Sequence, residues 1–536
     1  MTRTIDSIES GQFGRQNEGS GTFWFTPPAV CLMTISATER RTRATSAPLN
    51  ESSKLAILRI AASAFLLAFF LVRVAAPVAD LDNWHEMALI RESLAAGHLL
   101  KTDVFAYTPT LPEVVDHEWG AGALLYFTVK AFGGWAIIPL KFLVLLGAAG
   151  SVVLCTRLRK TSFQEFTLLV PLVIPAFSLG CATLRAQIYS FLFFAILLYL
   201  LELDSAGSRR WIGPWIAMVV LWTNLHGGVV MGVATLGFYW IERAVRGKPH
   251  FHILGVIAAS AAAISFNPFG LAYYGHLWTT LRMARPEITE WYGIQVLSKE
   301  QQVLFWFTLA ILPVLVWMRG WRASQGALIV AAMAGGTILH ARTIPFYAVA
   351  WAAYVPSLVA GTPLERIVRL PFRNRIAATA VCVCLTMLFV EMGLLVGAYR
   401  LIVPNDRFPV GAVRYLKEIH FHGNVMTHFG HGGYVSWWLY PAVKVSMDGR
   451  YDVAFPPALV DESFHFYEAR PDWRETLAKY PTDLVLVPVN TAVAALMPGT
   501  GWNLVYKDGS FQLYARPGMQ LPFRDASDGV FPVSFP

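Results

Sequence analysis

The sequence predicts an α-helical polytopic membrane protein that ends in an extracytoplasmic α/β domain. Hydrophobic residues make up 55% of the 536 residues and charged residues only 15%, which is more apolar surface than a soluble fold buries. Apolar runs long enough to span a bilayer recur up to about residue 395. After about residue 402, short apolar runs alternate with helical patterns, as in small α/β domains.

Three regions follow from this pattern. Residues 1–53 lack hydrophobic periodicity and predict a disordered cytoplasmic segment. Residues 54–401 predict the membrane domain, with an outer loop over residues 78–118. Residues 402–536 predict the soluble extracytoplasmic domain.

Clusters of basic residues set the predicted orientation. The net charge of +8 does not indicate a nucleic-acid partner, because Lys and Arg stand between apolar runs, where they hold loops on the cytoplasmic side. A pair of apolar segments separates each cluster from the next, so all clusters can be cytoplasmic at once. The clusters are at 157–160, 209–210, 243–250, 319–322 and 366–375.

About 11 net crossings follow, with the N-terminus cytoplasmic and the C-terminus outside. The stretch 119–132 is a further hydrophobic segment, which makes about 12. It is shorter than the roughly 20 residues that a span needs, so we expect it to lie along the membrane or to dip into it. The expected spans are about 55–77, 134–155, 166–183, 187–203, 212–226, 229–242, 253–267, 302–318, 324–340, 343–360 and 376–395.

The outer loop is rich in acidic, His and Trp residues. We expect a short helix in it that lies in the membrane interface and ends at Gly97. Asp80 and Asp82 precede this helix, where the ordinary interpretation is capping. The functional alternative is a carboxylate at the membrane surface whose raised pKa lets it act as a general base. The residues that could support it are His85, Asp116, His117 and Glu118.

Metal binding is not predicted. The acidic and His residues of the outer loop show no sharp ligand spacing. The five cysteines form neither a zinc spacing nor a disulfide framework. No cofactor is identified from the sequence.

Charged and His residues also occupy the turns opposite the basic clusters. Arg185 is the only charge in a long apolar run, and such a residue is costly unless it snorkels, pairs or lines a polar cavity. It either snorkels or binds a phosphate, and the same alternatives hold for Arg342 with His340. His226, within Asn-Leu-His-Gly-Gly, is either a structural residue at a helix end or a ligand. Glu290 lies in a long loop that either covers a substrate or forms a surface helix.

The tail predicts strands and helices in alternation. Its sheet is expected to be mostly parallel and to end in a hairpin with the turn Lys507-Asp508-Gly509. The expected strands are 424–429, 444–449, 483–488, 502–508 and 511–516, and the expected helices are 432–440, 457–469, 473–480 and 490–497.

Taken in order, these motifs resemble the bacterial C-type glycosyltransferase superfamily, polytopic membrane proteins related to the dolichyl- and polyprenyl-phosphate-sugar-dependent transferases. The tail motif G-G-Y-V-S-W-W-L-Y-P resembles the extracytoplasmic domain found with such proteins. It is also similar to the W-W-D-Y-G region of oligosaccharyltransferase catalytic subunits, but Leu439 replaces that Asp, so its role in peptide recognition does not carry over. The other motifs are D-L-D-x-W-H, H-E-W, L-R-A-Q, N-L-H-G-G, N-P-F-G, E-W and R-T-I-P-F.

The resemblance implies a membrane glycosyltransferase that moves a hexosyl or pentosyl group from a polyprenyl-phosphate-linked donor to an extracytoplasmic acceptor. The acidic residue in the first outer loop of the superfamily points to Asp82 as the catalytic base, with Asp80 as the alternate. The expected ligands of the donor phosphate are Arg185, Arg342, His226 and His340, supported by His85, His117, Glu118 and Glu290.

Two other classes stay open. A lipid or glycolipid transporter would use intramembrane Arg and His residues along its path, although the internal repeat of many transporters is not evident here. A non-catalytic membrane scaffold would keep only the fold. The expected partners are the donor lipid, the membrane and an unidentified glycan, lipid or protein acceptor, with no nucleic acid. The expected location is the bacterial inner membrane, with the C-terminal domain in the periplasm.

Overall fold

The computed structural model of the chain describes residues 51–75, 78–181, 183–283, 285, 288–373, 375–395, 401–529 and 533–535. Most of the segment predicted to be disordered, residues 1–50, lies outside these residues. Residues 51–53 already belong to the first helix, α1 (Glu51–Val74).

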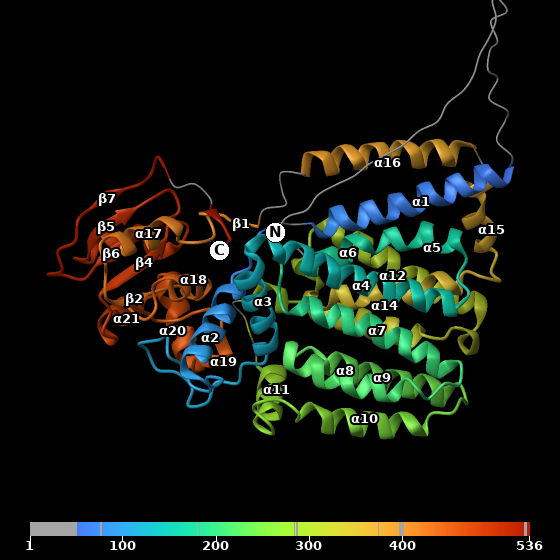
Figure 1. Ribbon diagram of the computed structural model, residues 1–536, viewed down its shortest axis with the longest axis horizontal. Helices are drawn as coiled ribbons and strands as arrows, with labels where there is room; N and C mark the ends of the chain where they lie inside the picture. The colour runs from blue at the N-terminus through green and yellow to red at the C-terminus, as the bar shows by residue number, and fades with distance from the viewer. Residues whose placement is uncertain are drawn as a thin grey trace, which may run out of the picture. The chain divides into compact units, whose positions relative to one another are not determined.

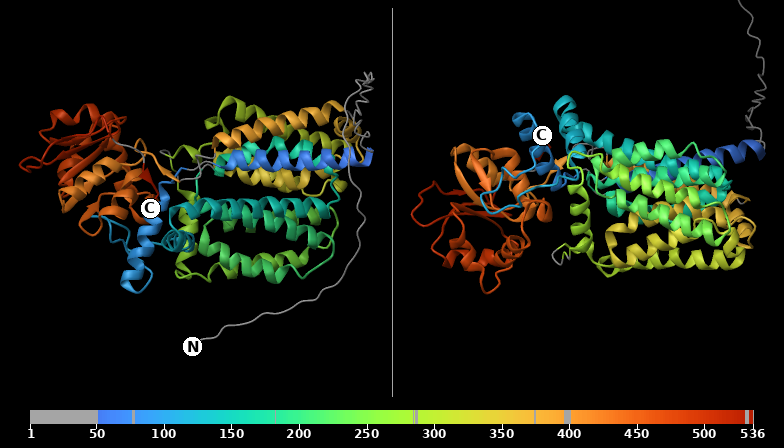
Figure 2. Two further views of the ribbon diagram at one scale, coloured as in Figure 1. Left: turned by 45° about the horizontal axis from the view of Figure 1, so that its top comes forward. Right: turned by 90° about the horizontal axis from the view of Figure 1, so that it is seen from below.

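A helical bundle forms the first part of the described chain. Its long helices run side by side in all three views (Figures 1 and 2). Besides α1 they are α4 (Ile137–Leu158), α7 (Gln187–Ser205), α8 (Ile212–Leu225), α9 (Val229–Val245), α10 (Phe251–Ile264), α12 (Lys299–Arg319), α13 (Ala327–Leu339), α14 (Ile344–Leu358) and α16 (Arg375–Leu395). Three short helices complete the bundle: α5 (Phe163–Leu169), α6 (Ile174–Ser178) and α15 (Leu364–Arg369).

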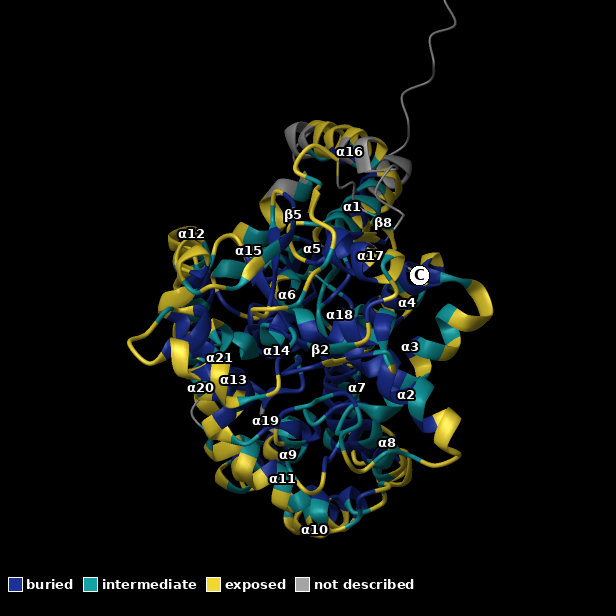
Figure 3. Cartoon of the chain, turned by 90° about the vertical axis from the view of Figure 1, so that its left-hand side faces the viewer, coloured by how far each residue is buried: buried dark blue, intermediate teal, exposed yellow. Residues whose placement is uncertain are grey.

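Burial in the bundle follows from the apolar character of each helix. All 15 residues of α14 are buried, because a helix that is hydrophobic all round is stable only inside. Helices α12 and α16 instead expose large apolar residues at the rim (Figure 3), such as Trp317 at 82% and Met387 at 66%. Apolar side chains on the outside of the bundle are expected where the solvent is lipid.

Four described helices are long and apolar enough to cross a membrane: Ala56–Val74, Gly134–Leu158, Gln187–Ser205 and Lys299–Arg319. The run predicted as the span 166–183 is broken, because α5 and α6 with their 3-10 extensions bend by 49°. If this pair counts as one span, the number is five. Helices α8, α10 and α13 have only 13 or 14 residues. The fold is therefore a multi-pass helical bundle, and the number of 11 crossings stays a prediction.

Three helices run across one end of the bundle (Figure 1): α2 (Asp82–Ala96), α3 (Trp119–Phe132) and α11 (Ala272–Arg282). Helix α3 has the predicted bounds and lies across α4 rather than beside it. Helix α2 ends at Gly97, whose φ of 74° is the left-handed conformation that glycine favours. Helix α2 is not amphipathic, because every residue from Asn83 to Ile90 is buried.

The C-terminal α/β region covers this end of the bundle. Trp84 of α2 is 1% exposed and packs against Phe408, Tyr434 and Phe535, with ring centroids 4.7–5.7 Å away. The first half of α2 is therefore enclosed by protein, not by lipid headgroups. For this half of α2 the prediction of an interfacial helix is wrong, because the C-terminal α/β region covers the face that was expected to contact the membrane.

Six strands of the α/β region form one sheet in the order β3-β2-β4-β6-β5-β7. Pairs β3-β2 and β2-β4 are parallel, β4-β6 and β6-β5 are antiparallel, and β5-β7 is parallel, so the sheet is mixed. The strands are β2 (Gly423–Met426), β3 (Val443–Val445), β4 (Leu484–Pro488), β5 (Asn503–Lys507), β6 (Phe511–Ala515) and β7 (Arg524–Asp525), with β1 (Ile402–Val403) and β8 (Val533–Ser534) paired separately.

Three helices of the C-terminal region lie where the sequence predicts them: α18 (Phe429–Leu439), α20 (Pro457–Tyr467) and α21 (Trp473–Lys479). Two further helices, α17 (Val410–Glu418) and α19 (Tyr451–Ala454), were not predicted. The helix expected over 490–497 is wrong, because this stretch forms two short 3-10 turns. A proline follows at position 498 and interrupts the helical pattern. The predicted hairpin turn is confirmed, since Asp508 Oδ1 accepts the N–H groups of Ser510 and Phe511 at 2.7 Å.

Candidate functional site

Arg185 contacts three of the carboxylates that the sequence predicts for the site. It lies in the short turn before α7, while the two aspartates lie at the start of α2. Arg185 Nε is 2.9 Å from Asp80 Oδ2 and 3.5 Å from Asp82 Oδ2. Its Nη1 is 3.0 Å from Oε2 of Glu290, in the loop after α11. Three segments far apart in the sequence thus meet at one guanidinium.

The two aspartates have different environments. Asp80 is 5% exposed, and its Oδ1 accepts the backbone N–H of Asp82 at 3.0 Å. Its Oδ2 accepts a hydrogen bond from the Thr183 hydroxyl and faces Arg185. Both oxygens of Asp80 are therefore engaged, which is the capping role weighed from the sequence combined with an ion pair.

Asp82 is freer than Asp80. Its side chain keeps 30% exposure, and its contact with Arg185 is the longer of the two. Burial raises the pKa of Asp82 to about 8; Arg185 lowers it in part, whereas Asp80, Glu118 and Glu290 raise it further. A carboxylate with such a pKa is a much stronger base than an ordinary aspartate and works near neutral pH.

A cavity of about 840 Å³ adjoins Arg185. One wall comes from the bundle side and the other from the α/β region. Among the charged, aromatic and His residues that line it are Asp80, Arg185, Glu290, Arg342, Arg407, Phe408 and His431. Asp82 is not among the residues that line the cavity, but it contacts Arg185, which does line it.

Arg342 is a cation of this cavity that has no acidic partner among the described residues. No described carboxylate lies within 4.0 Å of its guanidinium, which stands 4.3 Å from the ring centroid of Trp291. Arg285 lies at the same distance from that ring. Burial lowers the pKa of Arg342, and Glu290 offsets this only in part. A half-buried guanidinium that lacks a counter-charge favours an anionic ligand.

Glu118 organises a second group of residues on the other side of α2. Its Oε1 is 3.3 Å from Nε2 of His117 and 3.4 Å from Nε2 of His226. Burial alone would raise the pKa of Glu118, but His117 and His226 hold it below its usual range. Burial and the neighbouring Glu118 raise the pKa of Glu86, which shares a hydrogen bond with Glu118. Glu86 therefore carries the proton of this carboxyl pair.

The hydrogen bonds of His226 fix its tautomer. Gly228 N–H donates to Nδ1 at 2.9 Å. Because Nδ1 accepts this N–H, it carries no proton, and the Ser190 hydroxyl 2.7 Å away must donate to it. The Ser190 oxygen in turn accepts from Trp222 Nε1. Nε2 must then carry the proton and point it at Glu118. His226 is not among the residues that line the cavity.

His85 joins α2 to the α/β region. A Cβ added to Gly449 would lie 3.0 Å from His85 Nδ1 and 3.2 Å from Asp82 Oδ1. Only glycine therefore fits at position 449 without displacing one of these groups. Burial lowers the pKa of His85 to about 4, although Asp448 acts in the opposite direction.

A buried ion triad holds this junction. Arg450 Nη2 is 2.6 Å from Asp448 Oδ2 and 2.5 Å from Oδ1 of Asp103, in the segment between α2 and α3. All three side chains are at most 3% exposed. Asp448 and Arg450 are two positions apart in the sequence, whereas Asp103 comes from a distant segment.

The remaining predicted residue, His340, lies outside the cavity. It is exposed, and its Nδ1 donates to the Trp291 carbonyl at 2.8 Å. It therefore orients the loop whose Trp291 ring lies beside Arg342. Within the described ranges, no group of three His, Cys, Asp or Glu residues is arranged to hold a metal ion.

Sequence comparison finds no matching family model and no similar curated protein. Solved structures do match. The archaeal oligosaccharyltransferase AglB from Archaeoglobus fulgidus, in complex with an inhibitory peptide and a dolichol-phosphate, superposes with a TM-score of 0.56 at 13% identity, over 88% of this chain and 75% of that chain. The apo form of an Archaeoglobus fulgidus oligosaccharyltransferase gives 0.53 at 12% identity, over the same shares.

These likenesses define the class of fold. Over 88% of its length the chain shares its fold with these two oligosaccharyltransferase structures. The particular structures it is similar to are archaeal oligosaccharyltransferases, and at 12–13% identity the similarity is one of fold.

Proposed function

We propose that this protein is a membrane glycosyltransferase that moves a sugar from a polyprenyl-phosphate-linked donor to an acceptor hydroxyl outside the membrane. The observation that carries the proposal is that one site contains both a carboxylate with a raised pKa and a free cation. The carboxylate is Asp82, and the cation is Arg342, which lines the cavity and has no described acidic partner. A base and a phosphate ligand are the two groups that this transfer requires.

The reaction follows from the chemistry of these groups. Asp82 takes the proton of the acceptor hydroxyl as its oxygen forms a bond to the anomeric carbon. The bond between that carbon and the phosphate oxygen breaks, and the electron pair leaves with the lipid phosphate. Arg342 stabilises the charge that develops on the leaving phosphate. Arg185 fixes Asp82 and Asp80 and orients Glu290 at the cavity wall.

The remaining residues support this arrangement. His226 and His117 keep Glu118 ionised, and Glu118 in turn helps to raise the pKa of Asp82. His340 orients Trp291 beside Arg342. In this proposal the site lies on the periplasmic face of a bacterial inner membrane, and the tail from residue 402 forms the extracytoplasmic domain that closes the cavity.

The neighbouring structure was solved with a dolichol-phosphate, which is a lipid of the class proposed here. A transporter would instead need a polar path along the bundle. Helix α14 fills the bundle interior with 15 buried residues, most of them apolar, so the geometry favours the transferase.

Transfer from radiolabelled donors in membranes tests the proposal. The donors are a polyprenyl-phosphate hexose and a polyprenyl-phosphate pentose, with total membrane glycolipid and glycoprotein as acceptors. We expect transfer by the wild type and at least about 10²-fold less by Asp82→Asn. Asp461→Asn is the control, because Asp461 is an exposed acid on α20. Absence of wild-type transfer from every donor would favour the transporter or scaffold interpretation.

A further inference from the structure

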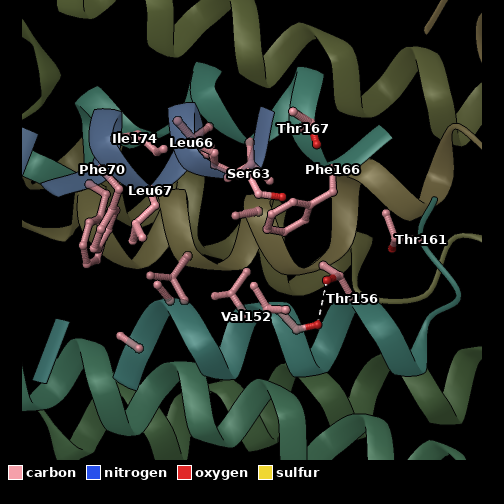
Figure 4. Close-up of a pocket in the computed structure, with 18 of the residues that line it drawn as sticks. Ser63, Leu66, Leu67, Phe70, Val152, Thr156, Thr161, Phe166, Thr167 and Ile174 are labelled. Atoms are coloured by element: carbon pink, nitrogen blue, oxygen red, sulfur yellow. Dashed lines mark hydrogen bonds between the residues drawn. The ribbon is translucent and has the colours of Figure 1, made fainter. Parts of the chain in front are cut away.

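A second cavity lies within the bundle between α1, α4, α5, α6 and α14. It has a volume of about 460 Å³ and an almost entirely apolar lining. Leu67, Val152 and Phe166 face it from three different helices (Figure 4). We call this cavity the apolar groove.

The apolar groove has one polar end. Thr156 and Thr161 lie at that end and Phe70 lies at the other (Figure 4). The polar end is formed by the last turn of α4 and the turn before α5, at the end of the bundle away from α2 and α3 (Figure 1). The cavity that contains Arg342 is at the opposite end.

The depth of the apolar groove matches one leaflet of a bilayer. Along α4 its lining runs from Leu146 to Arg157, which is about 16 Å at 1.5 Å per residue. This is roughly half of the ~30 Å hydrocarbon core. A single acyl chain that enters from the polar end fits this depth.

Three groups at the polar end lack a protein partner. Arg157 and Lys160 are exposed, and within the described residues no carboxylate lies at ion-pair distance from either. The Thr161 hydroxyl is buried and has no hydrogen-bond partner among the described residues. Arg157 and Thr161 both line the apolar groove. Two cations and one unsatisfied donor beside an apolar slot are complementary to a phosphate attached to an acyl chain.

We propose that the apolar groove binds an anionic phospholipid, with one acyl chain between α1 and α4 and the phosphate at Arg157 and Thr161. The phosphate of a transferable donor has to reach Arg342 at the opposite end, so this lipid is distinct from the substrate. The inference does not depend on the proposed transferase activity, since it concerns a binding site on the other side of the bundle.

Native mass spectrometry of the full-length protein in micelles tests this inference. Phosphatidylglycerol and phosphatidylcholine with identical chains are titrated separately. We expect phosphatidylglycerol to bind about fivefold more tightly, because one Arg near the membrane surface contributes about 1 kcal/mol toward an anionic lipid. Arg157→Gln removes this preference, whereas the control Arg210→Gln, an exposed arginine in the next basic cluster, keeps it.

Filling the apolar groove tests the position of the chain. Ala149→Phe should abolish binding of both phospholipids, while the control Leu154→Phe, on an exposed face of the same helix, leaves it intact. Equal affinity for the two lipids in the wild type would overturn the inference. So would undisturbed phospholipid binding by Ala149→Phe, or loss of polyprenyl-phosphate binding in its place, which would make the groove part of the donor site.

Discussion

Arg185 Nε lies 3.5 Å from Asp82 Oδ2, and the Asp82 side chain keeps 30% exposure. Asp80 lies closer to the same guanidinium, at 2.9 Å, and its side chain is only 6% exposed. The arginine therefore neutralises Asp80 and positions Asp82. Of the two aspartates, Asp82 is the one that can accept a proton from a substrate.

The pH dependence of transfer should report Asp82. Burial raises its pKa to about 8, and a general base acts in its ionised form, so the rate should rise tenfold per pH unit below pH 8 and level off above it. The measurement is the initial rate at saturating donor between pH 6 and pH 9.5. A rate that is flat or falls with rising pH across this range would show that Asp82 is not the base.

Arg342→Gln should lower the transfer rate by about 10²-fold, because it removes a charge that stabilises the leaving phosphate. Arg342→Lys should restore only part of the rate, since lysine lacks the planar fork of donors. Arg282→Gln is the matched control, because the exposed Arg282, the last residue of α11, also stacks on a tryptophan, with 3.8 Å to the ring centroid of Trp278. A similar loss in both glutamine variants would indicate a general effect of removing an arginine, not a role for Arg342 in the reaction.

Gly449→Ala should lower transfer while leaving the protein folded. The added Cβ would lie 3.2 Å from Asp82 Oδ1 and 3.0 Å from His85 Nδ1, so one of the two side chains has to move. His85→Ala in combination should recover part of the activity by making room. Gly499→Ala, which meets nothing within 4 Å, serves as the control. If Gly449→Ala keeps full activity, the close packing of the α/β region on Asp82 is not required.

Arg450→Gln should destabilise the junction between α2 and the α/β region. It leaves the buried Asp448 and Asp103 without their partner, and removal of one member of a buried ion pair costs about 3–5 kcal/mol. Thermal unfolding of the purified protein should show a clearly lower Tm than for Arg470→Gln, which removes an exposed pair with Glu468. Equal Tm values for the two variants would contradict a structural role of the triad.

Much of the site could be predicted because the basic clusters indicate how the helices are oriented in the membrane. Those clusters place Arg185, Arg342 and the outer loop on one side of the bundle, and the structure brings Asp80, Asp82, Glu290 and Arg185 together there. The bounds of α3 and the Asp508 turn were also readable, since segment length and turn residues are local properties.

Other features depend on contacts that no local pattern encodes. Asp103 meets Arg450 across 347 positions of sequence, and Thr183 and Ser190 acquire their roles only when α2 and α8 pack beside them. The burial of α2 under the α/β region was not predicted for the same reason. The apolar residues of α2 are equally compatible with a helix at the membrane interface and with a helix buried in protein. His226 points at Glu118 rather than into the cavity because of hydrogen bonds from Ser190 and Gly228.

The most direct test of the account is the single-turnover rate of Asp82→Asn at saturating polyprenyl-phosphate sugar, with donor binding measured on the same preparation. If Asp82 is the general base, we expect the rate to fall by about 10²–10⁴-fold, which is the usual contribution of a general base. The affinity for the donor should be unchanged. Transfer within a few-fold of the wild-type rate would contradict the assignment of Asp82 as the base.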